Sequence, residues 1–141
     1  SDIRIASETA QFGWPQVKRG ISSVSGPALL AQVVPRNIAF EFLFTGEFVN
    51  AQRALDLMLV NHVVPPDEVM PRAEEMARKI TANAPLSIAA IKDASVNGAA
   101  MDLERRVAYA QSKRDFVLHT EDAQEGVKAF AEKRAPVWKG R

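Results

Sequence analysis

Hydrophobic and polar positions change their period along the chain, from a short-range alternation to a helical repeat. Residues 2–5 alternate polar and apolar side chains, which is the two-residue period of a strand. Residues 11–14 and 59–64 also predict short strands, the first ended by Pro15, which has no N–H for a ladder. Short helices are predicted over residues 28–33, 36–44 and 50–57. Pro27 opens the first, Gly46 ends the second and Asn50 caps the start of the third.

After Pro65 and Pro66 the pattern is helical almost to the end. Helices are predicted from Asp67 to about residue 81, then over 86–97, 102–118 and 121–133, the last capped by Thr120. Apolar stripes are predicted on the first and last of these helices, namely Val69, Met70, Ala73, Met76, Ala77 and Ile80, and then Ala123, Val127 and Phe130. Helices joined by short links usually pack on another body or subunit, so we expect an oligomer.

Composition narrows the class of protein without naming a function. The 141 residues fit one domain or part of a larger one, and 18 basic and 17 acidic side chains give a net charge of +1 with no stripe for nucleic acid. The chain has no cysteine, no apolar run long enough for a membrane and no signal-peptide pattern, so we expect a cytoplasmic protein without a membrane partner. His62 and His119 stand alone, and no metal-ligand cluster is present, so both are interpreted as structural or surface residues. The residues alone therefore predict an α/β domain.

Four segments, in order and at the expected spacing, carry a resemblance to a known family. They are Asp2–Pro15, Phe44–Leu55, Leu59–Pro65 and Thr120–Arg134, and the match continues to Arg141. The chain resembles the C-terminal half of the crotonase superfamily, the enoyl-CoA hydratase/isomerase family. The resemblance implies an α/β fold in which residues 1–65 are the C-terminal portion of the crotonase-like ββα spiral core. Residues 66–141 then form a helical trimerisation region, so the implied assembly is a homotrimer or a dimer of trimers.

The same resemblance implies chemistry on coenzyme A thioesters, with no prosthetic group. Family members stabilise the enolate of the thioester with two backbone N–H groups, while one or two glutamates move protons. The two donors and the first glutamate precede the segment that matches Asp2–Pro15, so no residue of this sequence takes those roles. The position of the second glutamate is Gln16, whose neutral amide can orient a water but cannot exchange a proton. Gln16 therefore either lines the acyl pocket or is an ordinary turn residue, and two-carboxylate hydration is disfavoured.

Further positions are implied by the family pattern. Phe12, Trp14 and Gly20 are assigned to the acyl pocket, although both aromatic residues also suit the core. Phe130 and Lys133 match positions that contact the adenine and phosphate end of coenzyme A, often from a neighbouring subunit. The alternatives are core packing of Phe130 with Val127, and a solvated charge at Lys133.

Two departures from the family pattern stand out. The loop Ser22–Gly26 keeps one glycine where the family has several, so it is either a changed ligand contact or a serine-rich turn. Met58 stands where a glycine usually ends a helix, and a left-handed backbone there would cost about 1 kcal/mol.

Two functions stay open. One is an enzyme of the enoyl-CoA hydratase/isomerase type. The other is a non-catalytic or truncated crotonase-like module that binds acyl-CoA, oligomerises, or does both.

Overall fold

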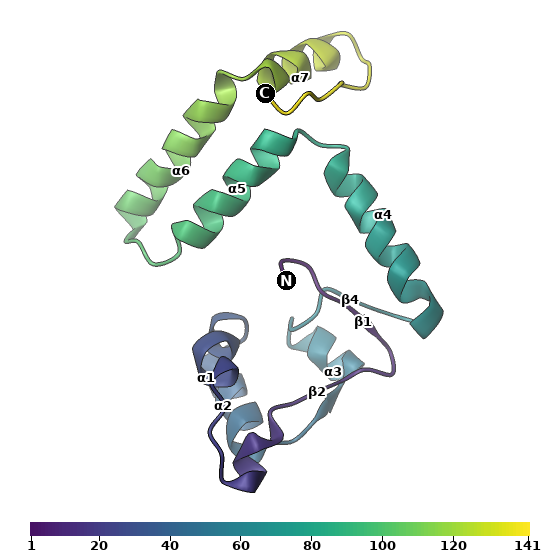
Figure 1. Ribbon diagram of the computed structural model, residues 1–141, viewed down its shortest axis with the longest axis vertical. Coiled ribbons are helices and arrows are strands. Elements are labelled where there is room, and N and C mark those ends of the chain that lie inside the picture. The colour runs from purple at the N-terminus through teal and green to yellow at the C-terminus, as the bar shows by residue number, and fades with distance from the viewer. The chain divides into compact units, whose positions relative to one another are not determined.

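Short strands come early in the chain and longer helices come late (Figure 1). The computed structural model describes all 141 residues as two units, Ser1–Met76 and Ala77–Arg141. The first unit holds β1 (Ile5–Ser7), β2 (Gln11–Phe12), η1 (Pro15–Arg19), α1 (Ser25–Leu29), η2 (Leu30–Gln32), α2 (Arg36–Thr45), β3 (Val49–Asn50), α3 (Ala51–Asp56), β4 (His62–Val64) and η3 (Pro66–Glu68). The helix α4 (Val69–Thr81) leads into the second unit, which holds α5 (Pro85–Asn97), α6 (Leu103–Leu118) and α7 (Glu121–Ala131).

Two small sheets organise the first unit. Strands β1 and β4 are parallel, with Ile5 opposite His62, while β2 and β3 are antiparallel, with Phe12 opposite Val49. The strand predicted over residues 2–5 is displaced, since β1 begins only at Ile5. Strand β2 keeps the first two residues of the predicted 11–14, and β4 is shorter than the apolar run 59–64. Leu59 and Val60, at the start of that run, close helix α3 instead, because their N–H groups both donate to the Ala54 carbonyl.

The core of the first unit lies between these sheets and the short helices. Three alanines with no exposed surface, Ala39, Ala51 and Ala54, allow the backbones to approach closely. Phe42 is buried, and the Trp14 ring meets it edge-on at a centroid separation of 6.2 Å. The rest of the buried set is Ala6, Leu30, Val34, Leu59 and Val60.

The predicted helix over residues 28–33 is wrong in its bounds and in the place of its proline. The chain enters α1 at Ser25, and the Ser23 hydroxyl accepts a hydrogen bond from the Gly26 N–H at 3.2 Å. Pro27 is thus the third residue of α1, where a missing N–H is still tolerated because the first turn has no intrahelical acceptors. A separate 3-10 turn, η2, follows at Leu30.

Several predicted helix ends are confirmed by the hydrogen bonds that cap them. The Asn50 side chain accepts from the Arg53 N–H at 2.8 Å, and Thr120 accepts from the Ala123 N–H at 3.1 Å. Gly46 ends α2 in the left-handed region at φ 61°. These polar side chains and glycines satisfy groups that a helix end leaves unpaired, which is why sequence identified them.

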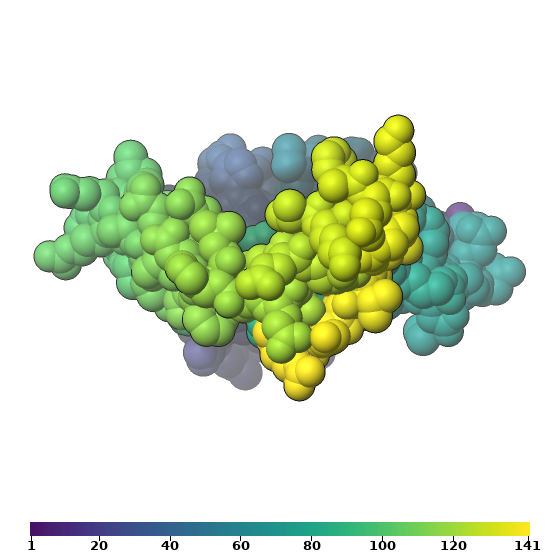
Figure 2. All heavy atoms as spheres, turned by 90° about the horizontal axis from the view of Figure 1, so that it is seen from above, coloured from purple at the N-terminus to yellow at the C-terminus, as the bar shows by residue number.

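The second unit is built on an α5–α6 pair and on a C-terminal tail that lies along α7. Asp93 on α5 accepts a hydrogen bond from Tyr109 on α6 at 2.8 Å, and it pairs with Lys113 at 2.5 Å. In Figure 2 the yellow spheres of the tail lie against the yellow-green spheres of α7. The Trp138 indole N–H donates to the Ala82 carbonyl at 2.8 Å, which ties the tail to the end of α4.

The two predicted apolar stripes do not form a core in this chain. No side chain of α4 is buried, and Met70 is 66% exposed. On α7, Val127 is 74% and Phe130 is 88% exposed, so packing of Phe130 in the core is wrong. The buried residues of α7 are instead Asp122 and Ala129, because the tail covers that side of the helix.

Candidate functional site

A cavity of about 480 Å³ lies in the first unit, beside the turn that follows β2. Pro15 starts the 3-10 turn η1, since its fixed φ suits the first helical position, and Gly20 ends it at φ 68°. The loop Ile21–Ser23, Pro27 and one side of α2 complete the wall. The full lining is Trp14, Gln16, Val17, Gly20, Ile21, Ser22, Ser23, Pro27, Phe40, Leu43 and Phe44.

The cavity brings together three of the four residues that sequence placed at the acyl end. Trp14, Gln16 and Gly20 all line it. Phe12 lies on β2 and packs against the hydrophobic core, outside this lining. The wall is apolar and aromatic on most sides, which suits an acyl chain.

Gln16 contributes the one buried polar atom in this wall that has no partner. Its Oε1 is buried and accepts no hydrogen bond from the chain. An unpaired buried acceptor costs about 1–3 kcal/mol, so any hydroxyl or N–H donor that reached this oxygen would relieve that cost. The amide can orient such a group but cannot serve as a proton acceptor, as the sequence predicted.

Gly26 has a packing role in the loop that departs from the family pattern. A Cβ added to Gly26 would lie 2.3 Å from Leu43 Cδ2 and 3.0 Å from Trp14 Cδ1. The glycine thus allows the loop to approach α2 and the indole. Ser22 and Ser23 both line the cavity, so this serine-rich turn also forms part of its wall.

Phe40 and Phe44 are site residues that sequence reasoning missed. Their rings stack at a centroid separation of 5.0 Å and an interplanar angle of 14°, and both line the cavity. Phe44 is 70% exposed. The spacing of four residues on a predicted helix was the available signal, because such pairs share one helix face.

The residues assigned to the coenzyme end lie at the end of α7, in the second unit. Phe130 projects from the last turn, and Lys133 follows the helix with φ 54°, a left-handed conformation that is uncommon outside glycine. Lys133 is exposed, and its ammonium group makes no ion pair. An exposed aromatic ring and an unpaired cation three residues apart are suited to a nucleotide-like anion.

The lone histidines have ordinary surroundings. His62 lies within β4, and His119 caps the end of α6, where its Nδ1 lies 2.7 Å from the Asp115 carbonyl oxygen. No group of three or more His, Cys, Asp or Glu side chains is placed to hold a metal ion. No helix combines the length and the apolar character needed to cross a membrane.

Comparison with known proteins decides the family. The family model described as enoyl-CoA hydratase/isomerase matches residues 1–141. The chain belongs to the enoyl-CoA hydratase/isomerase family. The crotonase-like fold expected from sequence is thereby confirmed.

Relatives and solved structures of this family agree over the whole chain. An (E)-benzylidenesuccinyl-CoA hydratase of Thauera aromatica is 40% identical over 140 residues, covering 99% of this chain and 55% of that protein. A carnitinyl-CoA dehydratase of Salmonella typhi is 42% identical over 146 residues, covering 100% and 56%. The crystal structure of an enoyl-CoA hydratase/isomerase from Mycobacterium paratuberculosis aligns with a TM-score of 0.96 at 38% identity, again covering 100% and 56%.

This enoyl-CoA hydratase/isomerase family chain spans about half the length of the curated relatives it matches. The curated relatives named above act on coenzyme A thioesters.

Proposed function

We propose that this chain provides the acyl-binding cavity and a coenzyme A contact for enoyl-CoA hydratase/isomerase-type chemistry on acyl-CoA thioesters. The observation that carries the proposal is the cavity itself, which gathers Trp14, Gln16 and Gly20 beside the turn that matches the family. Its aromatic wall holds the acyl group. Phe130 and Lys133 bind the adenine and phosphate end of a coenzyme A molecule.

Gln16 sets what the chain can contribute to the reaction. Its amide holds a hydroxyl or a water by the buried Oε1 and leaves proton transfer to carboxylates elsewhere. A neutral amide at position 16 agrees better with reactions that need one carboxylate, such as movement of a double bond, than with hydration that needs two. No residue of this chain matches the oxyanion donors, so the enolate-stabilising step is not assigned to it.

The second candidate is a non-catalytic crotonase-like module that binds acyl-CoA, oligomerises, or does both. The neutral residue at Gln16 favours it, as do α4, α5 and α6, none of which has a buried side chain. Helices of this kind gain stability when a second subunit covers them. We propose a homotrimer, or a dimer of trimers, as that assembly.

Calorimetric titration of the 141-residue chain with octanoyl-CoA and with free coenzyme A tests both functions. We expect octanoyl-CoA to bind more tightly than coenzyme A, and Trp14→Ala to remove the difference because it opens the acyl wall. Phe130→Ala should weaken both ligands about equally. Phe48→Ala is the matched control, since Phe48 is an exposed phenylalanine of the first unit that does not line the cavity.

Turnover tests the assignment of Gln16. The same preparation, with its mass confirmed, is expected not to hydrate crotonyl-CoA, because Gln16 cannot act as an acid or a base. Measurable hydration would overturn this assignment of Gln16. Absence of binding by either ligand would overturn the acyl-CoA proposal itself.

A further inference from the structure

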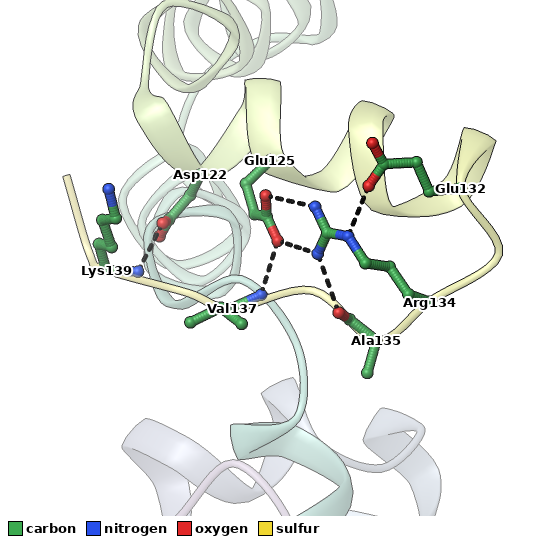
Figure 3. A network of polar contacts seen from close by, with 7 residues as sticks. All are labelled: Asp122, Glu125, Glu132, Arg134, Ala135, Val137 and Lys139. Carbon is green, nitrogen blue, oxygen red and sulfur yellow. Dashed lines mark hydrogen bonds and ion pairs between the residues drawn. The ribbon is translucent and has the colours of Figure 1, made fainter.

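Four side chains, two on α7 and two just after it, form a polar network that fixes the tail, and we name it the tail clamp. It consists of Asp122, Glu125, Glu132 and Arg134 (Figure 3). The two oxygens of Asp122, a side chain of which only 2% is exposed, accept the Lys139 and Gly140 N–H groups at 2.7 and 2.9 Å. One turn later, Glu125 Oε1 accepts the Val137 N–H at 2.9 Å. Two consecutive turns of α7 therefore hold the tail backbone by carboxylates.

Arg134 is the centre of the clamp, and four of its five N–H donors are bonded to Glu125, Glu132 and the Ala135 carbonyl. Its Nη1 and Nη2 donate to the two oxygens of Glu125 at 2.6 and 3.0 Å, and its Nε donates to Glu132 at 2.6 Å. Figure 3 shows the guanidinium lying between these two carboxylates. Such bidentate pairs combine charge with fixed geometry. The hydrogen bonds from Arg134, followed by the one from the Val137 N–H, lower the pKa of Glu125 to about 2, so the pair is charged at neutral pH.

Lys133 lies in the sequence between two members of the clamp, Glu132 and Arg134. Glu132 precedes it, Arg134 follows it, and these neighbours are bonded to each other across it. The Lys133 backbone has φ 54°, which costs an ordinary residue about 1 kcal/mol or more and therefore needs support from its surroundings. The Arg134 N–H donating to the Ala129 carbonyl at 3.0 Å closes the turn.

The clamp and the exposed phenylalanine lie on different sides of α7. Five residues separate Glu125 from Phe130, which turns the helix by about 140°. The tail covers the side of Asp122 and also passes Gly126, where an added Cβ would lie 3.4 Å from the Trp138 ring. Phe130 is left 88% exposed. The tail therefore stabilises this end of the helix without covering the ring.

We propose that Arg134, held by Glu125 and Glu132, is the positioning residue that presents the Lys133 ammonium beside Phe130 for a phosphate of coenzyme A. This inference rests on the proposed coenzyme A contact and adds the device that orders it. Arg134 acts through the backbone of Lys133 and does not touch the ligand. A cation held in one place loses less conformational freedom when an anion binds.

Two substitutions, Glu125→Gln and Arg134→Lys, distinguish positioning of Lys133 from simple electrostatic attraction by the direction in which they change coenzyme A affinity. Glu125→Gln removes a negative charge, so simple attraction of an anion would make coenzyme A bind more tightly. Positioning demands the opposite, because the neutral amide no longer forms the charged fork with Arg134. Arg134→Lys keeps the positive charge but cannot bond both carboxylates, so positioning again demands weaker binding.

The experiment is a titration of the full 141-residue chain with coenzyme A at fixed ionic strength. We expect Lys133→Met, Glu125→Gln and Arg134→Lys each to raise the Kd about threefold, the scale of one surface charge contact. The Lys133→Met/Glu125→Gln double variant should match Lys133→Met alone, because the two changes remove one interaction. Glu121→Gln is the control: this carboxylate lies on the same helix but pairs with Lys139 and Arg141, and its loss should leave binding unchanged or slightly tighter.

Each outcome decides between the two proposals. Unchanged or tighter binding by Glu125→Gln, or additive losses in the double variant, overturns the positioning role while the coenzyme A contact stands. Unchanged binding by Lys133→Met overturns the contact itself, and with it the inference. Hydrogen exchange at the Val137 amide, compared with that at Lys139, shows in each variant whether the clamp has opened locally or the helix has unfolded.

Discussion

Met58 is the residue where local backbone strain is clearest. It follows α3 with φ 57°, so the left-handed turn of the family pattern is kept, and it is 80% exposed. Its own N–H donates to Leu55, and the next N–H, from Leu59, donates to the Ala54 carbonyl at 2.8 Å. The hydrogen bonds that close the helix thus require the left-handed conformation, whichever side chain is present.

Met58→Gly is therefore expected to stabilise the chain. Removing the Cβ relieves about 1 kcal/mol of strain, and little packing is lost because the side chain faces solvent. The measurement is the free energy of unfolding from urea denaturation. Leu57→Gly is the control, since Leu57 has φ −85° and gains nothing from glycine. A lower stability for Met58→Gly would show that the methionine makes contacts that outweigh the strain.

Some single residues could be predicted from sequence, and others depend on the three-dimensional fold. Asn50, Thr120 and Gly46 were predictable because a cap or a left-handed end is decided within a few residues. The placement of Gln16 in a cavity wall came from family resemblance, but its unpaired Oε1 did not, because a missing partner is visible only in three dimensions. Phe130 looked like a core residue by its spacing, yet its surroundings depend on the path of the tail.

At the scale of elements, the tail is joined to α7 by hydrogen bonds from its backbone to carboxylates of the helix. The predicted helix extended to Lys133, but α7 ends at Ala131, and the next residues turn back to bring Arg134 to Glu125. Sequence periodicity could not foresee this, because the helix was predicted on the apolar repeat Ala123, Val127 and Phe130, and Asp122 and Glu125 lie outside it. They are in fact the acceptors for the tail.

The contribution of Glu125 to stability should fall in acid. Its pKa is lowered from 4.5 to about 2 in the folded chain, so its stabilisation is complete above about pH 4.5 and is lost as the pH falls toward 2. Glu125→Gln should therefore destabilise the chain at pH 7 and make less difference at pH 3. Thermal unfolding across this range measures the effect. A constant difference at all pH values would show that the ion pair contributes nothing; Glu104→Gln, on the exposed first turn of α6, is the control.

The α5–α6 pair has a related acid sensitivity. Hydrogen bonds from Lys113, Asn97 and Tyr109 lower the pKa of Asp93 to about 2, while Lys113 lies 5.0 Å from the centroid of the Tyr109 ring. This cluster joins two helices that have no buried side chain. Polar contacts therefore add to the packing that holds these two helices together.

At the scale of the whole chain, exposed apolar side chains on these helices require an explanation. Soluble monomers rarely leave large contiguous apolar surface in water. On α5 and α6 the large exposed side chains are Ile91, Val96, Leu103, Val107, Phe116 and Leu118. A cavity of about 390 Å³ between the two helices, with Ile91, Ala94 and Val117 in its wall, lies on the same pair. Burying such a surface would stabilise the chain by about 25 cal/mol for each Å² of apolar area removed from water.

We therefore expect self-association through α5 and α6, with a molar mass in solution about three times the 15.5 kDa of one chain. Light scattering coupled to size exclusion measures it at micromolar concentration. Ile91→Glu should shift the mass toward that of one chain, because a carboxylate buried without a partner is costly at an interface. Val24→Glu is the control, since Val24 is also highly exposed but belongs to the first unit. A wild-type mass of a single chain would contradict the expectation. Equal effects of the two variants would place the interface elsewhere, since then the α5–α6 surface would have no special part in assembly.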